Sequence, residues 1–327
     1  MLIAKEPTAA DSEGIKAIYL ESRLENFMQT LPPGLIQMAK GLGMKNIMNG
    51  MAGFDHDELL AGCVDDFLDE RNRCILLEED FKTIGYCIAS YEIVNDFGRI
   101  KHLIGIGDIF IKKECRRKGL GSKLLKAFVD EMNKKEICSI ITVLKEKQYT
   151  PANVKLFEKN GFVLEKLSYN LNLTKKKYKV DHTIRKAVPG DYEGYAKLIT
   201  AMYESFLDFD KNIYHGTDVV FSQGYYLEEL REPNCLHTVC EIDNEIAGIC
   251  MITVEEDSVF IHSVSVADKY ARQGVATSLY HNAFNFAKEQ GYSEIKAVVF
   301  AQNETSCGFH EHMMMRPESH RYIYKTI

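Results

Sequence analysis

The residues with the clearest chemical potential form a basic, glycine-bearing turn. They are Arg116, Arg117, Lys118, Gly119, Leu120, Gly121 and Ser122. An apolar, strand-like run from Ile104 to Ile111 precedes the turn, and an amphipathic helix is expected to begin near Ser122. The first N–H groups of a helix have no partner inside it, and the helix dipole adds partial positive charge there. Glycine also lets a phosphate approach the backbone closely. The turn therefore predicts an anion site, with an ordinary strand–helix turn as the alternative.

The same unit occurs a second time, around Gly274. When Gly119 is aligned with Gly274, the apolar helix residues from Leu124 to Met132 match those from Leu279 to Ala287, and both sets have helical spacing. The strand residues that match are Ile109 and Ile111 in the first copy and Val264 and Val266 in the second. The repeat predicts two copies of one domain, residues 1–174 and 181–327. The lysine-rich stretch between them, Thr174 to Lys179, is expected to be a solvated connector.

Composition narrows the class of protein. The chain has 327 residues, a formal charge of −7 and 40 basic against 47 acidic residues, which argues against a protein that coats nucleic acid. No apolar run approaches the roughly 20 residues that span a bilayer, and the first residues do not resemble a signal peptide. The nine cysteines form no C-x-x-C pair, which favours free thiols in a reducing compartment. We therefore expect a cytoplasmic protein with no membrane or nucleic-acid partner.

Two motifs in this order resemble those of the GNAT superfamily of N-acetyltransferases. The turn is similar to that family's acyl-CoA pyrophosphate loop, and Leu156 to Phe162 is similar to its L-Y-x-x-x-G-F segment. The resemblance covers both halves and implies an α/β (α+β) fold of two tandem domains, each a mixed twisted sheet flanked by helices. It also implies acetyl-CoA as the cofactor. Pyrophosphate would lie on the N–H groups of Arg117 to Ser122, and the pantetheine arm would pair with the splayed strand near Ile109 to Lys113.

Both halves supply residues to the cofactor site that the resemblance implies. In the first half they are Ile109, Phe110, Ile111, the turn residues Arg116 to Ser122, and Phe157. In the second half they are Val264, Val266, Arg272, Gln273, Gly274, Val275, Ala276 and Asn303.

The two halves depart from the family pattern differently. In the first, Phe157 takes the place of a frequent acidic tyrosine, and Thr150 replaces the usual asparagine. In the second, Ala271 begins the loop, while Asn303 is kept and His310 takes the tyrosine position. The first half thus has the better cofactor loop, and the second has the better candidate for a general acid.

Four residues are candidates for proton transfer. Asp108 and Glu92 could accept a proton from the amine in the first half, and His262 could do so in the second. His310 could protonate the departing thiolate, because histidine titrates near neutrality. Each has a structural alternative, as a solvated carboxylate or a packed histidine. His310 and His312 lie two residues apart on different helix faces, so no metal site is expected.

We therefore expect transfer of an acetyl group from acetyl-CoA to a primary amine of a small molecule or peptide, by a monomer or homodimer. One alternative is that only the second domain catalyses and the first is a structural relic. Another is an acyl-CoA-binding regulatory protein in which one or both domains are degenerate, which the phenylalanine at position 157 favours.

Overall fold

The structure is a computed structural model, and it describes residues 1–30, 63–96, 99–135, 137, 139–174, 176–206, 208–209, 222–256 and 258–325. Side chains are described in these ranges except at 27–30, 92–96 and 99–102. The chain divides into two compact units. The first contains Met1–Val143, Gln148–Val163 and Tyr322–Ile327, and the second contains Leu144–Lys147 and Leu164–Arg321.

The first unit is built on strands β1 to β5. Its elements in chain order are β1 (Leu2–Lys5), η1 (Ala9–Asp11), α1 (Ser12–Thr30), β2 (Asn72–Glu79), β3 (Lys82–Asp96), β4 (Arg99–Ile111), η2 (Lys113–Cys115), α5 (Leu120–Lys134), β5 (Ser139–Lys145) and α6 (Pro151–Lys159). The strands lie side by side in numerical order. Neighbours are antiparallel except β4 and β5, which are parallel and joined through α5.

The second unit repeats this arrangement. Its elements are β6 (Val163–Asn172), β7 (Thr183–Lys186), η3 (Pro189–Asp191), α7 (Tyr192–Phe206), α8 (Gln223–Glu229), β8 (Cys235–Ile242), β9 (Glu245–Val254), β10 (Val259–Val266), η4 (Asp268–Tyr270), α9 (Val275–Glu289), β11 (Glu294–Phe300), α10 (Glu304–His312) and β12 (Arg316–Lys325). The strand order is β7-β8-β9-β10-β11-β6, and only β10 and β11 are parallel. A mixed sheet with helices in each unit confirms the predicted fold class.

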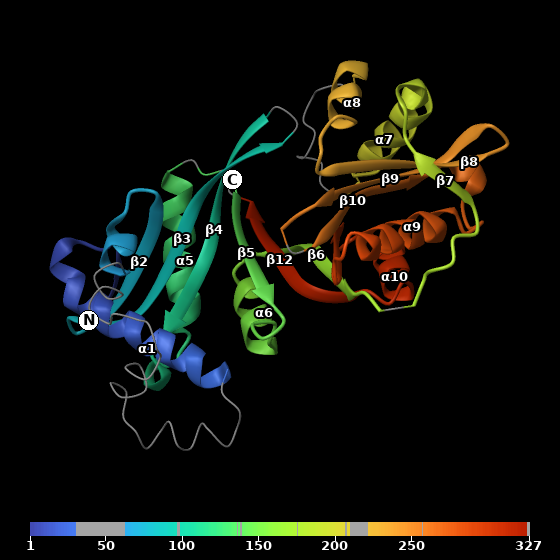
Figure 1. Ribbon diagram of the computed structural model, residues 1–327. Helices are drawn as coiled ribbons and strands as arrows, with labels where there is room; N and C mark the ends of the chain where they lie inside the picture. The colour runs from blue at the N-terminus through green and yellow to red at the C-terminus, as the bar shows by residue number, and fades with distance from the viewer. Residues whose placement is uncertain are drawn as a thin grey trace. The chain divides into compact units, whose positions relative to one another are not determined.

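Helices cover both faces of the second sheet, with α7 and α8 on one side and α9 on the other (Figure 1). The apolar stripe predicted from Leu279 to Ala287 is buried between α9 and the strands, as is the matching stripe of α5 from Leu124 to Met132. Burying one such leucine or phenylalanine side chain is worth about 1.5–3 kcal/mol. The repeated sequence pattern therefore marks the same packed helix twice. Among the described helices, none is long and apolar enough to cross a membrane.

The compact units follow strand pairing, whereas the predicted domains follow the sequence repeat. Residues 166–172 of β6 pair with β11, so most of this strand belongs to the second unit although it follows α6 in the chain. The residues from Tyr322 onward belong to the first unit, where the Tyr322 ring stacks on that of Phe157. Strand β6 thus completes the sheet of the second unit, and the last residues of β12 belong to the first.

Candidate active site

The basic turn has the same backbone conformation in both units. Arg117 and Arg272 have φ of 63° and 62°, and Gly119 and Gly274, which precede α5 and α9, have φ of 77° and 84°. Positive φ is uncommon for a residue other than glycine, so finding it at both arginines shows that the loop is a specific structure. Among the described residues, no acceptor binds the backbone N–H groups from Arg117 to Ser122. These groups are therefore available to an anion at the start of α5.

Arg116 anchors the first loop. Its guanidinium forms two hydrogen bonds of 2.6 Å with the Glu25 carboxylate of α1, and its Nε donates to the Ile111 carbonyl at 2.8 Å. The paired carboxylate raises the pKa of the Arg116 guanidinium. Arg117 and Lys118 are exposed and form no ion pair in the described part of the chain. The charge available to a phosphate comes from these two residues, and Arg116 holds the loop in place.

The space beside the two loops differs. A Cβ added at Gly119 would meet no atom of the described residues within 4 Å, so nothing in that part of the chain covers the first loop at this glycine. A Cβ at Gly274 would lie 3.7 Å from Nε2 of His182, which comes from the segment before β7. That nitrogen also lies 2.9 Å from the Gln273 carbonyl oxygen. The second loop is therefore partly covered by a side chain that has no counterpart at the first.

A β-bulge marks the strand that leads into each loop. In β4 the extra residue is Gly107, because Asp108 pairs with Ile88 while Ile106 pairs with Ala89. In β10 the extra residue is His262. Pairing with the parallel neighbour stops just before each bulge, at Ile106 in β4 and at Ile261 in β10. The strand edge beyond the bulge, including Ile109 to Ile111, is left without a strand partner on that side. Bulges of this kind often lie next to active sites.

Asp108 stands directly after the first bulge, on the face of the sheet covered by α1. Its Oδ2 accepts a hydrogen bond from the Tyr86 hydroxyl at 2.6 Å and a longer one from the Ser22 hydroxyl at 3.5 Å. Its Oδ1 has no hydrogen-bond partner among the described residues. Burial and the Asp108 charge raise the pKa of Tyr86, so the tyrosine is a donor that positions the carboxylate. Asp108 is thus held by two hydroxyl groups, with one oxygen left for a substrate proton.

The other candidate site residues of the first half differ in their burial and in how far the structure describes them. Glu92 lies in β3, but its side chain is outside the described residues. Phe110 and Ile111 are largely buried, and Phe110 packs with Tyr86. Phe157 is also buried, in α6 between the rings of Phe162 and Tyr322. Packing against these two rings accounts for the burial of Phe157. Its neighbours contact the loop, because the Leu156 side chain lies 3.4 Å from a Cβ added at Gly121 and the Asn160 amide donates to the Ser122 hydroxyl at 3.2 Å.

The second unit has a histidine at its bulge, where the first has Gly107. Ser263 takes the position of Asp108, and Nε2 of His262 lies 2.6 Å from the Thr253 hydroxyl. His262 is exposed to solvent, yet neighbouring groups desolvate its ring enough to lower its pKa. A neutral imidazole can accept a proton, so this site retains a possible base.

His310 and Asn303 have structural partners in the second unit. His310 is buried in α10, its Nδ1 lies 2.7 Å from the Ser306 carbonyl oxygen, and its Nε2 lies 2.7 Å from the Tyr280 hydroxyl. A carbonyl only accepts, so Nδ1 carries the proton and Nε2 accepts from Tyr280. Burial lowers the pKa of His310 as well. Asn303 caps α10 by accepting from the Ser306 N–H, as Thr150 caps α6 by accepting from the Asn153 N–H. This arrangement does not favour His310 as a proton donor to a thiolate.

Comparisons with known proteins agree with this geometry. The model for the acetyltransferase (GNAT) family matches residues 199–314, and that for the acetyltransferase (GNAT) domain matches residues 70–164. The chain is a two-domain member of the GNAT family. A putative alanine N-acetyltransferase of ribosomal protein bS18 from Bacillus subtilis (strain 168) is 26% identical over 102 residues, which are 31% of this chain and 68% of that protein.

Solved structures add a likeness in fold. A GCN5-related N-acetyltransferase from Sphaerobacter thermophilus matches 99% of this chain and 96% of its own, with 14% identity and a TM-score of 0.53. A tandem GNAT protein from the clavulanic acid biosynthesis pathway aligns over 100% of this chain with 11% identity and a TM-score of 0.41.

Three residues near the GNAT loops were missed by sequence reasoning. Glu25 and Tyr86 contact Arg116 and Asp108 across 91 and 22 positions of the chain, and His182 contacts Gln273 across 91. No spacing rule connects pairs so distant in sequence. Of the three, only Tyr86 could have been found from the sequence, because the alternation of β3 places it on an inward face.

Proposed function

We propose that the chain is an acetyl-CoA-dependent N-acetyltransferase that acts on a primary amine of a small molecule or peptide. The observation that carries the proposal is the first loop, where the N–H groups from Arg117 to Ser122 have no acceptor, and Gly119 no covering atom, among the described residues. A helix start of this kind suits the pyrophosphate of coenzyme A. Exposed Arg117 and Lys118 would add charge, and the unpaired edge of β4 from Ile109 to Ile111 would pair with the pantetheine arm.

Asp108 is our candidate for the general base. An ammonium group cannot attack a thioester, so the acceptor must first lose a proton, and Oδ1 of Asp108 is free to take it. Tyr86 and Ser22 hold the carboxylate while the neutral nitrogen forms the new bond to the acetyl carbon. The nitrogen loses its second proton to solvent, the C–S bond breaks and the thiolate leaves. A thiol has a pKa near 8.5, so water can protonate it, and the lack of a donor at Phe157 need not stop the reaction.

The first domain is the proposed catalytic domain, because His182 lies against the second loop. The peptide option is supported by the Bacillus subtilis relative, whose name describes acetylation of an alanine in a ribosomal protein. A cytoplasmic location is supported by the buried thiols of Cys74, Cys87 and Cys250, which form no disulfide. The alternative, an acyl-CoA-binding protein without catalysis, is favoured by the buried Phe157.

Calorimetric titration with acetyl-CoA tests the cofactor site. Gly119→Glu should abolish binding at the first loop, because its carboxylate would repel pyrophosphate at the free N–H groups. Gly274→Glu should leave this binding unchanged. Gly291→Glu is the matched control, since Gly291 has φ of 88° and open space around it but lies outside both loops. It introduces the same charge and backbone strain at a distance from the phosphate.

Acetyl transfer is then measured by release of free thiol from acetyl-CoA in the presence of a panel of amines and N-terminal peptides. Release that needs both an amine and an intact Gly119 is expected. Folded wild-type protein that binds no acetyl-CoA would overturn the proposal. Tight binding without transfer to any amine would favour the regulatory alternative.

A further inference from the structure

A cavity of about 810 Å³ lies in the second unit, between α9, the edge strand β7, its neighbour β8, and the segment before β7. Ile184, Leu236 and Phe286 contribute apolar surface to it. The loop residues 271–276 are not among its lining residues, but His182, which lies beside the second loop, is one of them. The cavity therefore adjoins the second loop, and all its lining residues belong to the second unit, whereas the proposed phosphate site is the first loop. Its size is in the range of pockets that hold small organic ligands.

One wall of the cavity is the connector, which is fixed to α9 along its backbone. Asn285 accepts from the Tyr178 N–H at 2.9 Å and donates to the Tyr178 carbonyl at 2.8 Å. Nδ1 of His281 lies 2.5 Å from the Lys179 carbonyl oxygen, and Ser278 accepts from the Asp181 N–H. Positions 278, 281 and 285 lie on one face of the helix. The side chains of Lys176, Lys177 and Lys179 are exposed, as expected of a connector, but hydrogen bonds fix the backbone to the domain.

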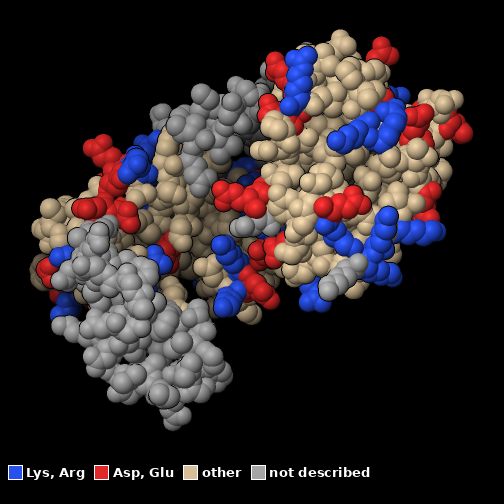
Figure 2. All heavy atoms as spheres, viewed as in Figure 1, with Lys and Arg blue, Asp and Glu red and all other residues tan. Residues whose placement is uncertain are grey.

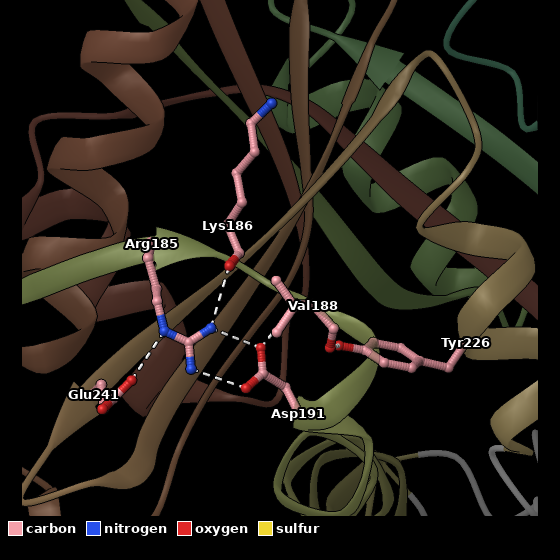
Figure 3. Close-up of polar contacts among 6 residues, drawn as sticks. All are labelled: Arg185, Lys186, Val188, Asp191, Tyr226 and Glu241. Atoms are coloured by element: carbon pink, nitrogen blue, oxygen red, sulfur yellow. Dashed lines mark hydrogen bonds and ion pairs between the residues drawn. The ribbon is translucent and has the colours of Figure 1, made fainter.

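Lys186 supplies a positive charge to this cavity. It pairs across the strands with Thr238, and both residues line the cavity. The neighbouring Arg185 is already occupied, by two bonds of 2.7 and 2.8 Å to Asp191 and one of 2.9 Å to Glu241. Figure 3 shows the Lys186 ammonium extending away from this ion-pair cluster. No ion pair of Lys186 occurs in the described part of the chain.

The charge around the opening is mainly positive. Lys177 lines the cavity together with Lys186, and Glu289 is the acidic residue of the lining. Lysine and arginine side chains gather over the connector on the face shown in Figure 2. A cation therefore lies within reach of an apolar wall, a combination that suits a ligand with one anionic end and an apolar body.

We propose that this cavity binds a small organic anion, a carboxylate or a phosphate ester with an aromatic or aliphatic body. The anionic group pairs with Lys186, the side-chain amide of Asn282 can donate to it, and the body packs on Leu236 and Phe286. The site goes beyond acetyl transfer and does not depend on it.

Calorimetric titration with phenyl phosphate tests the site, in the presence of excess coenzyme A to occupy the loops. Phenyl phosphate should bind the wild type, benzyl alcohol should bind at least tenfold more weakly, and benzylamine should not bind. Lys186→Glu should weaken phenyl phosphate binding by about tenfold or more, since one charge-assisted hydrogen bond is replaced by repulsion. Lys197→Glu is the matched control, because Lys197 is an exposed lysine of α7 on the opposite face of the same sheet.

Equal weakening by both glutamate variants would overturn the proposal, since only net charge would then matter. Binding of inorganic phosphate as tight as that of phenyl phosphate would also overturn it, because the apolar wall would contribute nothing. Lys186→Met removes the charge without adding a carboxylate, so it keeps the test decisive should Lys186→Glu fold poorly. Retention of full phenyl phosphate affinity in Lys186→Met would equally contradict the assignment.

Discussion

Around Gly119 and Gly274 the backbone follows one path, with left-handed residues at the same two positions. The neighbours of the two loops differ. The first is tied to α1 by the Arg116–Glu25 pair and has no described residue packed on Gly119, whereas the second begins with Ala271 and lies beside His182. The strand bulges are likewise shared, but one is followed by Asp108 and the other is formed by His262. The repeat has thus kept the backbone that would bind a cofactor, while the side chains that could move a proton have diverged.

Replacing Asp108 should have the largest effect, a fall in the rate of acetyl transfer. If the rate did not fall, the first domain would not supply the general base. Asp108→Asn keeps the shape and can still accept from Tyr86, but it cannot take a proton from an ammonium group. We expect kcat with an amine acceptor to fall about 10²- to 10⁴-fold, the usual value of one general base. Steady-state kinetics with Ser263→Ala, the equivalent position of the second domain, should show little change. The reverse result, with His262→Gln inactive and Asp108→Asn active, would move catalysis to the second domain.

A buried histidine should make the second domain more sensitive to acid than the first. His237 is 3% exposed, with Nδ1 2.8 Å from the Tyr195 hydroxyl, and Cys74 takes its place in the first domain. Burial lowers the pKa of His237 from 6.5 to about 4. The unfolded chain therefore binds a proton at a pH where the folded one does not. The contribution of the neutral His237 ring to the free energy of unfolding is fully present above pH 6.5. It is lost as the pH falls toward 4, which lowers the free energy of unfolding by about 3 kcal/mol.

His237→Cys, which installs the residue of the first domain, should remove this part of the pH dependence. Hydrogen exchange measured on peptides from β8 and β9 at pH 7 and pH 4.5 reports the local stability, and peptides from β2 and β3 serve as the internal reference. An unchanged difference between the two domains in the variant would show that other groups cause the acid sensitivity.

Breaking the anchor of the first loop should have a smaller effect. Glu25→Gln leaves Arg116 without its ionic partner, so the loop is held less firmly against α1. Because a partly exposed ion pair is worth up to about 1 kcal/mol, we expect the dissociation constant of acetyl-CoA to rise about two- to fivefold. Calorimetry checks this, with Glu245→Gln as the control, since Glu245 forms an exposed pair with Lys269 in the second domain. A loss as large as that of Gly119→Glu would mean that Glu25 fixes the whole loop.

The sequence predicts the features of this protein that depend on local pattern. The helical stripes after Gly119 and Gly274 were read from spacing alone, since residues three and four apart on a helix share a face. Asp108 could be nominated because it lies in the strand before the loop. The partners of these residues could not be found, because Glu25 meets Arg116 only through the packing of α1 against the sheet. Likewise, no pattern predicted that the connector would be bonded along α9 and would bring His182 to the second loop.

Removing His182 should have the smallest effect, a change in acetyl-CoA affinity. It tests directly whether this side chain makes the second loop differ from the first. His182→Ala clears the space beside Gly274, so the surroundings of the second loop become more like those of the first. It also removes one hydrogen bond to the Gln273 carbonyl, worth about 0.5–1.5 kcal/mol, which lets the loop adjust to a phosphate.

In a Gly119→Glu background, where only the second loop can bind, acetyl-CoA affinity should improve about two- to fivefold by calorimetry. His281→Ala, which loosens the same connector away from the loop, should leave it unchanged. Weaker binding in His182→Ala would instead make His182 a ligand of the cofactor, and the two loops would then differ in how they hold a phosphate.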